Sequence, residues 1–232
     1  MSARKPSPTD APSARRKPTA TTAPRATPPR ARPKSGKAAG RPPGADSERS
    51  HDALLDAARA HFARRGYGPA NVRELAAGAG YTTSTLYHYF GDKLGLYVEV
   101  YRHAERQVAA AYRAAVEKGG SRQERLLAVL DAAIALHKRD ESVPLFLAAV
   151  PLDIRRHPEV RSAIVAVPIE TPRILAQLVA GPDGRENAQL VQLITSVTTG
   201  MALMVGEGGH AAYEEALRTC ARHLQVDDAT PR

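Results

Sequence analysis

Apolar side chains recur at intervals of three and four residues over most of the chain from about residue 46 onward. This period belongs to an α-helix with one buried face, and no alternating pattern of useful length indicates a β-strand. The first four helices are expected to cover, in chain order, residues 47–65, 72–79, 83–90 and 93–118. The pattern therefore predicts an all-α fold.

Residues suited to helix ends support these boundaries. Gly66 stands where a C-terminal cap belongs, directly after the first periodic segment. Asn71, Thr82 and Asp92 each suit the N-cap position of the helix that follows. Asn71 is also followed three residues later by Glu74, which is the spacing of a capping box. We therefore expect two short, capped helices between two longer ones.

The later part of the chain is predicted to be helical but interrupted. Ser121 and Glu124 have capping-box spacing at the start of a further helix with an apolar face. Pro144 and Pro158 each suit the first turn of a helix. Three other prolines lie inside apolar stretches that they are expected to kink or break: Pro151, Pro168 and Pro172.

Two narrow apolar seams follow. Residues 190–204 carry apolar side chains spaced four, three, four and three apart, and those of residues 213–224 are spaced four, three and four apart. Such seams are typical of helices that pack side by side. Cys220 lies on the second seam, which favours a small buried side chain over a redox sensor. Residues 206–209 are glycine-rich but lack the Lys-Ser/Thr ending of a phosphate loop, so they are expected to link the two helices.

The charge of the chain is unevenly distributed. Residues 1–44 hold eleven Lys and Arg residues and one acid, Asp10, whereas the whole chain has a net charge of +9. The same segment holds ten of the eighteen prolines, no aromatic residue and no branched aliphatic residue. It cannot bury enough apolar surface to offset its ordering entropy, so it is predicted to be disordered. Either a solubilising tail or an arm that follows a nucleic-acid phosphate backbone fits this composition.

Residues 81–93, YTTSTLYHYFGDK, have an unusual mixture of aromatic and hydroxyl side chains. On a helix of 100° per residue, one side collects Leu86, Tyr89 and Phe90. The other side is polar and free of acids: Thr83, Ser84, Thr85, Tyr87 and His88. Hydroxyl, phenol and imidazole groups can reach phosphates and base edges in a major groove. We therefore expect Leu86, Phe90 and at least the ring of Tyr89 in the core, and the polar side at a surface that contacts DNA.

Two other interpretations of this polar side have less support. Tyr87 and His88 could pack in the core with only their polar tips exposed. A catalytic role is weaker still, because no carboxylate lies nearby in sequence to orient the imidazole and no G-x-S-x-G pattern occurs. The sequence is accordingly predicted not to be an enzyme.

The residues before this segment complete the spacing of a helix-turn-helix. Ala76 is small enough for two helices to cross closely, Gly80 follows four residues later in the turn, and Leu86 anchors the second helix six residues after that. Leu75 and Ala79 complete the inward face. The combined spacing is far more specific than any one of these residues.

On these residues the chain resembles the tetracycline-repressor (TetR) family of bacterial transcription regulators over about residues 50–97. The resemblance is carried by Gly66-Tyr67, by NVRELA at 71–76 and by the segment 80–93 with its TLYHYF core. It implies base or phosphate contacts, or helix caps facing phosphates, at Asn71, Thr82, Thr83, Ser84, Thr85, Tyr87, His88, Tyr89 and Lys93. Many relatives carry Lys and Gly where this chain has Thr83 and Ser84. That departure leaves the operator sequence open and shifts electrostatic affinity toward the N-terminal arm.

The resemblance also implies how the chain is organised. A disordered basic tail (1–45) would precede a DNA-binding domain (46–97), a helical ligand-binding and dimerisation domain (98–225) and a C-terminal tail (226–232). The protein would be a cytoplasmic homodimer, most readily a repressor, that binds a near-palindromic operator in double-stranded DNA and is released by a small-molecule effector.

Two further sets of residues follow from this organisation. The seams would form a four-helix dimer interface through Leu190, Ile194, Val197, Met201, Met204, Tyr213, Leu217, Cys220 and Leu224. An effector pocket beneath the interrupted helices would involve His137, Phe146, Leu147 and Val150. For all four pocket residues, ordinary core packing is the default interpretation, with His137 as a hydrogen-bonded core histidine.

The remaining chemistry narrows the class of protein. The histidines form no H-E-x-x-H or Cys/His cluster, so no metal site and no cofactor are expected. The single cysteine rules out an internal disulfide framework and suits a reducing compartment. No apolar run approaches the roughly eighteen residues of a membrane helix, and no secretory signal is expected. The rival interpretation is an architectural or single-strand-binding protein whose affinity comes mainly from the basic tail.

Overall fold

The computed structural model describes residues 43–180, 187–206 and 208–224, with residues 43–50 described as backbone only. Within these residues the secondary structure is helical, without a β-strand. The helices are α1 (Pro43–Arg65), α2 (Val72–Gly78), α3 (Thr83–Phe90), α4 (Lys93–Val116), α5 (Arg122–Arg139), α6 (Ser142–Arg156), α7 (Pro158–Val165), α8 (Thr171–Val179), α9 (Ala188–Val205) and α10 (His210–His223). The all-α prediction is confirmed here. The two predicted tails lie outside the described residues, apart from residues 43–45, which belong to α1 instead of the tail.

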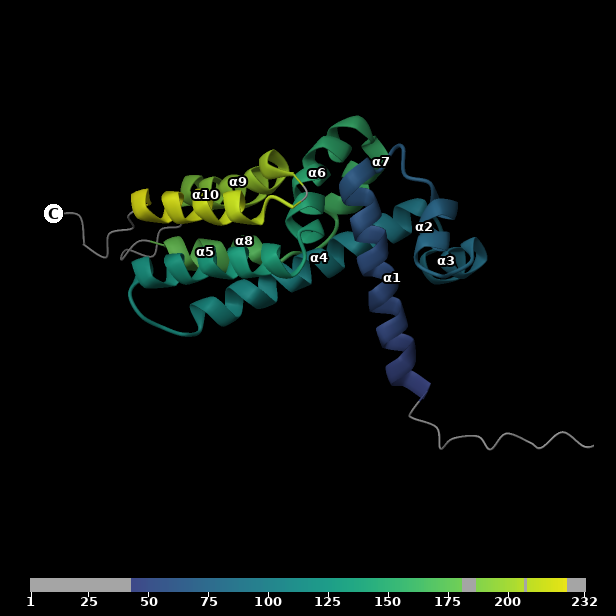
Figure 1. The fold of residues 1–232 in the computed structure, drawn as a ribbon, viewed down its shortest axis with the longest axis horizontal. Helices are drawn as coiled ribbons and strands as arrows, with labels where there is room; N and C mark the ends of the chain where they lie inside the picture. Colours follow the sequence, from purple (N-terminus) through teal and green to yellow (C-terminus); the bar gives the residue numbers. More distant parts are fainter. Residues whose placement is uncertain (1–42, 181–186, 207, 225–232) are drawn as a thin grey trace, which may run out of the picture. The chain divides into compact units, whose positions relative to one another are not determined.

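The first three helices form the predicted helix-turn-helix group (Figure 1). α2 packs against α1 and α3, and both α1 and α3 pack against α4. The inward positions of the helix pair are buried as expected, at Leu75, Ala76 and Leu86. Each buried leucine contributes roughly 1.5–3 kcal/mol relative to an exposed one. These contacts fix the angle at which α3 presents its opposite face.

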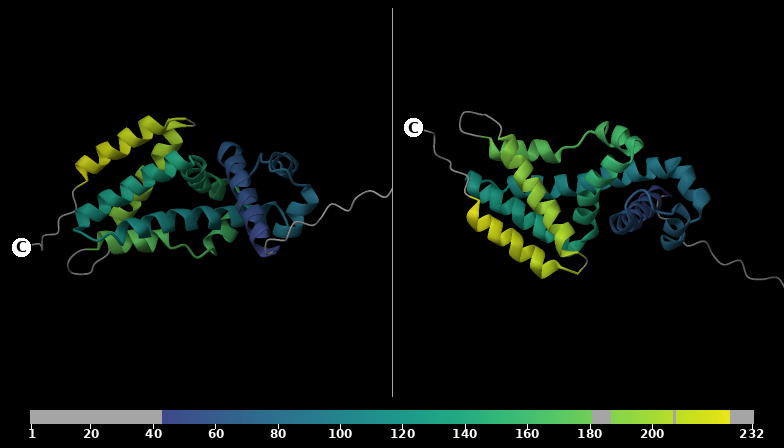
Figure 2. Two further views of the ribbon diagram at one scale, coloured as in Figure 1. Left: turned by 60° about the horizontal axis from the view of Figure 1, so that its bottom comes forward. Right: turned by 90° about the horizontal axis from the view of Figure 1, so that it is seen from above.

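The remaining helices pack around α4 and α6 (Figures 1 and 2). α5 contacts α4 and α10, α8 contacts α4 and α9, and α9 contacts α6 and α10. Because α4 and α6 also contact α1, these two helices join the N-terminal group to the rest of the described chain.

The predicted N-caps are confirmed. Asn71 Oδ1 accepts a hydrogen bond from Arg73 N at 2.9 Å, and Asp92 Oδ1 accepts one from Gly95 N at 2.7 Å. One detail of the first cap differs from expectation. The Glu74 carboxylate lies 3.3 Å from the Arg65 guanidinium of α1, so it forms an ion pair between helices instead of closing a capping box. The capping box predicted at the start of α5 does form.

The turn between α2 and α3 depends on Gly80. Its φ is +76°, a conformation that L side chains rarely adopt. Tyr81 N donates to Ala76 O at 2.8 Å and Gly80 N donates to Ala77 O at 3.1 Å, which is the pattern of a Schellman motif. The turn is therefore tight enough to bring α3 directly across α2.

The prolines have mixed outcomes. Pro158 opens α7 and Pro172 lies in the first turn of α8, while Pro168 lies between these two helices. Of the two outcomes expected at Pro151, a kink or a break, the break does not occur, because α6 runs through this residue from Ser142 to Arg156. The backbone hydrogen bond lost at Pro151 is offset by burial of the neighbouring Val150 and by the hydrogen bonds that Asp153 accepts from Tyr67 N and Tyr97 Oη.

α9 corrects another expectation. By length and composition, this helix is long and apolar enough to cross a membrane. Its apolar residues do not form an uninterrupted run, because Thr, Ser and Gln lie between them. One such helix is weak evidence for a membrane, since helices of soluble proteins pass the same test.

Candidate functional site

The polar face of α3 is exposed. Tyr87 is 48% exposed and Tyr89 is 53% exposed, whereas Leu86 and Phe90 are buried beneath them. The expectation that the Tyr89 ring lies in the core is therefore wrong. Leu86 and Phe90 are one turn apart and fill the space above α4, so the ring of Tyr89 lies at the edge, with its centroid 6.2 Å from the His51 ring of α1.

The start of α3 is ordered by its own hydroxyl groups. Thr82 Oγ1 accepts a hydrogen bond from Thr85 N at 3.1 Å and lies 2.8 Å from Thr85 Oγ1. Ser84 and His88 are exposed, and Thr83 and Thr85 are half-buried. The predicted contact residues of α3 thus share one accessible surface on a short helix that is anchored from below.

The first turn of α2 borders the same surface. A hollow lies between the two helices and is lined by Ala70, Asn71, Val72, Arg73, Thr83 and Tyr87. Arg73 is exposed, and sequence reasoning missed it as a candidate contact. The sequence did hold a signal for it. Arg73 lies two residues after the N-cap Asn71, in the first turn of α2, and a cation in that turn borders the hollow between α2 and α3. Arg73 thus places a cation beside α3, a helix that contains no Lys or Arg.

Lys93 is partly committed within the chain. Its ammonium donates a hydrogen bond to Gly68 O at 2.8 Å and lies 4.7 Å from the centre of the Tyr67 ring. Burial lowers the pKa of Lys93. An ammonium has three donors, and one of them holds α4 to the turn after α1, which leaves two for a phosphate.

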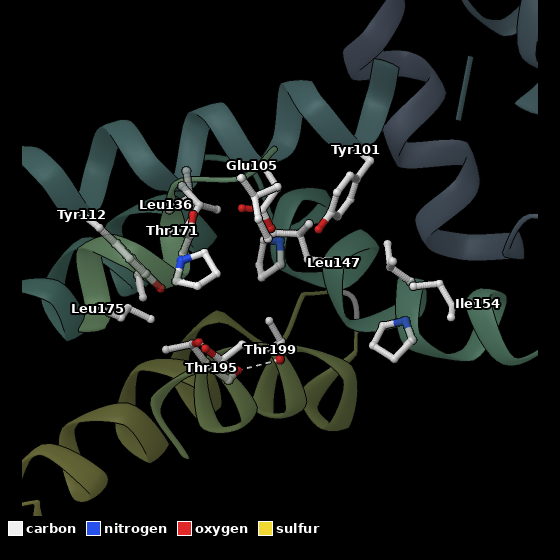
Figure 3. A pocket seen from close by; sticks show the side chains of 18 of the residues that line it. Tyr101, Glu105, Tyr112, Leu136, Leu147, Ile154, Thr171, Leu175, Thr195 and Thr199 are labelled. Carbon is white, nitrogen blue, oxygen red and sulfur yellow. Dashed lines mark hydrogen bonds between the residues drawn. The ribbon is translucent and has the colours of Figure 1, made fainter. Parts of the chain in front are cut away.

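A cavity of about 280 Å³ lies between α4, α5, α6, α8 and α9 (Figure 3). Its wall is mostly apolar, with contributions from Val108, Leu136, Pro144, Leu147, Val150, Pro151, Ile154, Ile169 and Leu175. Polar groups come from two sides: Tyr101, Glu105 and Tyr112 on α4, and Thr195 and Thr199 on α9 (Figure 3). Such a lining suits a mostly apolar ligand oriented by a few polar contacts.

Glu105 and Thr171 are the notable polar groups of this cavity. Glu105 Oε2 and Thr171 Oγ1 are both buried and have no hydrogen-bond partner among the described residues. Burial raises the pKa of the Glu105 carboxyl, and the nearby Thr171 hydroxyl opposes part of that rise. Unsatisfied buried polar atoms are costly, so a ligand that bonds to them would gain affinity there.

The four predicted pocket residues separate into two pairs. Leu147 and Val150 lie on the cavity wall. Phe146 and His137 do not, which corrects their placement. Phe146 points to the other side of α6, with its ring 5.2 Å from that of Tyr97. His137 is fully buried and stacks on Tyr213 at 4.0 Å.

α6 connects this cavity to the N-terminal helices. One face lines the cavity, and the opposite face carries Asp153, which is buried. Asp153 Oδ2 accepts a hydrogen bond from Tyr67 N at 3.0 Å, in the turn after α1, and one from Tyr97 Oη of α4 at 2.9 Å. A displacement of α6 would therefore strain two contacts at the base of the helix-turn-helix.

A second buried link joins α1 to the start of α6. Arg59 is 1% exposed, and its Nε donates to Ser142 Oγ at 2.9 Å. Its two terminal nitrogens bond to Asp56, at 2.7 Å, and to Asp140. The hydrogen bond from His103 and the charge of Arg59 together lower the pKa of Asp56 to about 2. The guanidinium is buried, and each of its three nitrogens has a hydrogen-bond partner.

The two apolar seams lie partly inside the chain. Ile194, Tyr213 and Leu217 are buried by their own chain, so they are not free to meet a partner, which corrects that part of the predicted interface. Met204 is 81% exposed, and three further residues of the set are partly exposed: Leu190, Val197 and Met201. Cys220 and Leu224 on α10 are also partly exposed. Two exposed residues of α9 lie outside the predicted set, Leu193 and Leu203.

Comparison with known proteins adds to this geometry. The family model of bacterial regulatory proteins, tetR family, matches residues 54–100. The HTH-type transcriptional repressor KstR2 of Mycobacterium tuberculosis is 38% identical over 73 residues, which cover 32% of this chain and 36% of that protein. The match therefore spans little more than a third of the relative's length.

Solved structures resemble a larger part of the chain. A TetR transcriptional regulator from Legionella pneumophila has a TM-score of 0.58 and 18% identity, over 74% of this chain and 94% of that chain. The transcriptional regulator FadR of Bacillus subtilis, solved in complex with stearoyl-CoA, has a TM-score of 0.56 and 16% identity, over 75% of this chain and 100% of that chain. At these identities the similarity shows the shared fold.

Proposed function

We propose that this chain, a member of the tetR family of bacterial regulatory proteins, is a DNA-binding transcriptional repressor that a small molecule releases from its operator. The observation that carries the proposal is the exposed, acid-free face of α3, held across α2 by the Gly80 turn. Hydroxyl, phenol and imidazole groups gathered on this face suit contact with DNA, and therefore regulation, better than enzymatic turnover.

In this proposal α3 enters the major groove. Thr83, Ser84 and Thr85 meet base edges or phosphates, and the exposed rings of Tyr87 and Tyr89 flank the sugar-phosphate backbone. Their neighbour on the same surface, His88, contacts a phosphate or a base. The N-terminal ends of α2 and α3, capped by Asn71 and Thr82, favour nearby phosphates through unpaired backbone N–H groups.

A second copy would complete the DNA-binding unit. The exposed apolar side chains of α9, above all Leu203 and Met204, support an interface between two chains through this helix. Two α3 helices held by such a dimer would enter successive major grooves about 34 Å apart and read a near-palindrome.

The cavity supports a ligand with an apolar body and one polar group. A hydrogen-bonding group at the Glu105 and Thr171 end would satisfy two buried oxygens that lack partners among the described residues. The volume of about 280 Å³ fits a compact molecule. The apolar wall would account for most of the affinity, and Glu105 would select the polar group.

A larger amphipathic ligand is the second candidate. A groove lined by Arg102, Arg106 and Arg113 shares Glu105 and Ile169 with the cavity. An apolar chain in the cavity with an anionic head at these arginines would resemble an acyl-CoA, the class of molecule in the FadR complex. Titration with a long-chain acyl-CoA and with the matching free fatty acid separates this candidate from the compact one.

Release of DNA would follow from a shift between two arrangements of α4 and α6. Both helices line the cavity and both contact the N-terminal group: Asp153 of α6 accepts a hydrogen bond from Tyr67 N, and the Tyr97 ring of α4 lies 5.0 Å from that of Phe62. A ligand that fits one arrangement better would shift the population toward it and change the separation of the two α3 helices.

Selection from a random duplex library tests the DNA-binding part of this proposal. We expect the full chain to enrich a short, two-fold symmetric site at physiological salt, and Ser84→Ala with Thr83→Ala to weaken or alter that enrichment. Enrichment of no sequence, with binding that decreases steeply with salt for every duplex alike, would contradict it and favour the architectural alternative.

A further inference from the structure

Three titratable side chains from distant parts of the sequence meet at the junction of α5, α6 and α10. His137 belongs to the last turn of α5, Glu141 directly precedes α6, and His210 is the first residue of α10. His137 Nδ1 and His210 Nδ1 are 3.1 Å apart. One ligand atom from each of the three residues lies within 4.8 Å of the others.

We propose that His137, Glu141 and His210 bind a divalent transition-metal ion of the zinc type. Two imidazole nitrogens that each lie about 2.0–2.1 Å from a tetrahedral zinc are separated by about 3.4 Å. The observed 3.1 Å is close to that value, and a carboxylate oxygen of Glu141 lies 3.6 Å from His210 Nε2, so the three side chains are near enough to reorient around one ion.

The nitrogen pair itself favours a cation. Two Nδ1 atoms that face each other at this distance can hold one hydrogen between them. A metal ion between them accepts both lone pairs at once. Two nitrogens and one carboxylate oxygen with an open position suit zinc, nickel or cobalt, whereas magnesium and calcium require mostly oxygen ligands.

The surroundings hold these groups in place. His137 is fully buried and its ring stacks on Tyr213, with an angle of 9° between the planes. The Glu141 carboxylate accepts a hydrogen bond from Gly208 N at 2.8 Å, which orients it toward His210. His210 and Glu141 are partly exposed, so an ion can reach the site from solvent.

Binding would fasten α10 to the junction between α5 and α6. This junction also carries Asp140 and Ser142, which hold Arg59 of α1. The metal site does not depend on the proposed DNA binding, because it can be measured on the protein alone.

The test uses the untagged full-length chain, freed of metal with a chelator and titrated with CoCl₂ and with ZnCl₂. We expect one ion per chain, visible d–d absorption of tetrahedral cobalt that zinc bleaches, and a higher melting temperature with zinc. His210→Ala and Glu141→Gln should each weaken zinc binding at least about 10-fold, since even residues that only support a ligand cost that much. His223→Ala, an exposed histidine on the same helix, is the matched control.

Because His137 is buried, His137→Ala can fail to fold, so the two more accessible variants carry the test, with circular dichroism as the check on folding. Zinc affinity that is unchanged in His210→Ala and Glu141→Gln would overturn the proposal, as would the absence of cobalt absorption in the wild-type chain at micromolar protein and metal.

Discussion

At the scale of single residues, local backbone chemistry positions the polar face of α3. Thr82 starts the helix, Gly80 turns the chain before it, and Leu86 and Phe90 fasten it. A further glycine sets the next junction: a Cβ at Gly95 would lie 2.1 Å from the Phe90 carbonyl oxygen, so α4 can follow α3 this closely only with glycine there.

Two glycines of α2 and its turn give a matched pair of stability predictions. Gly80→Ala should lower the free energy of unfolding by about 1–2 kcal/mol, because φ is +76°. Gly78→Ala lies in the helix with open space around its Cβ and should raise it by up to about 1 kcal/mol. Chemical denaturation of both variants measures the difference, and equal effects would refute the role given to Gly80.

Glu105 gives a pH prediction. Its pKa is higher in the folded chain than its ordinary 4.5, so the folded state binds the proton more tightly. The contribution of this carboxyl to the free energy of unfolding therefore falls as pH rises from 4.5 through the raised pKa. Glu105→Gln lacks the carboxyl and does not show this loss. The stability advantage of the variant should grow across that window and then stay constant.

Denaturation curves at several pH values check this, with the exposed Glu117→Gln as control. An advantage that is independent of pH, or one shared by Glu117→Gln, would contradict a buried carboxyl at the cavity.

At the scale of elements, α6 has two different faces. Asp153→Ala removes the acceptor for Tyr67 N and Tyr97 Oη, both buried, and should cost roughly 3 kcal/mol of unfolding free energy. Leu152→Ala, at the exposed neighbouring position, should cost little. Thermal or urea denaturation compares them, and a small loss in Asp153→Ala would remove the main link proposed between cavity and turn.

The sequence allowed the helix boundaries and caps around α2 and α3 to be predicted, because capping and turn chemistry act over a few residues. It placed the ring of Tyr89 in the core, whereas the ring is exposed, since periodicity alone does not say how far a neighbouring helix covers the edge of a buried face. Phe146 and Leu147 illustrate the same limit: adjacent apolar residues of α6 look alike in sequence, yet one faces Tyr97 and the other the cavity.

Long-range contacts were beyond the sequence. His137 and His210 are 73 positions apart, and no local spacing indicates that they meet. Arg59 likewise finds Asp140 and Ser142 across 81 and 83 positions. The continuation of α6 through Pro151 depends on packing of the residues beside it, which outweighs the local cost of proline.

At the scale of the whole molecule, the exposed apolar side of α9 is the proposed contact with a second copy. Met204→Glu should shift the chain from dimer to monomer, because it places a charge in the proposed interface, at a residue that is 81% exposed in the single chain. Val165→Glu on α7, at 76% exposure, is the matched control and should leave the dimer intact. Sedimentation velocity decides: a wild-type monomer, or an unaffected Met204→Glu dimer, would exclude this interface.

The central claim is that α3 reads a specific DNA site. The most direct measurement is footprinting on the DNA upstream of the gene for this chain, with excess random duplex at physiological salt. We would compare the wild type with Tyr87→Ala, with Tyr87→Phe, which keeps the ring, and with a chain that lacks residues 1–42.

A short symmetric protected site is expected, abolished by Tyr87→Ala, weakened less by Tyr87→Phe, and kept at lower affinity without residues 1–42. Diffuse protection that ignores Tyr87 and vanishes with residues 1–42 would contradict the account.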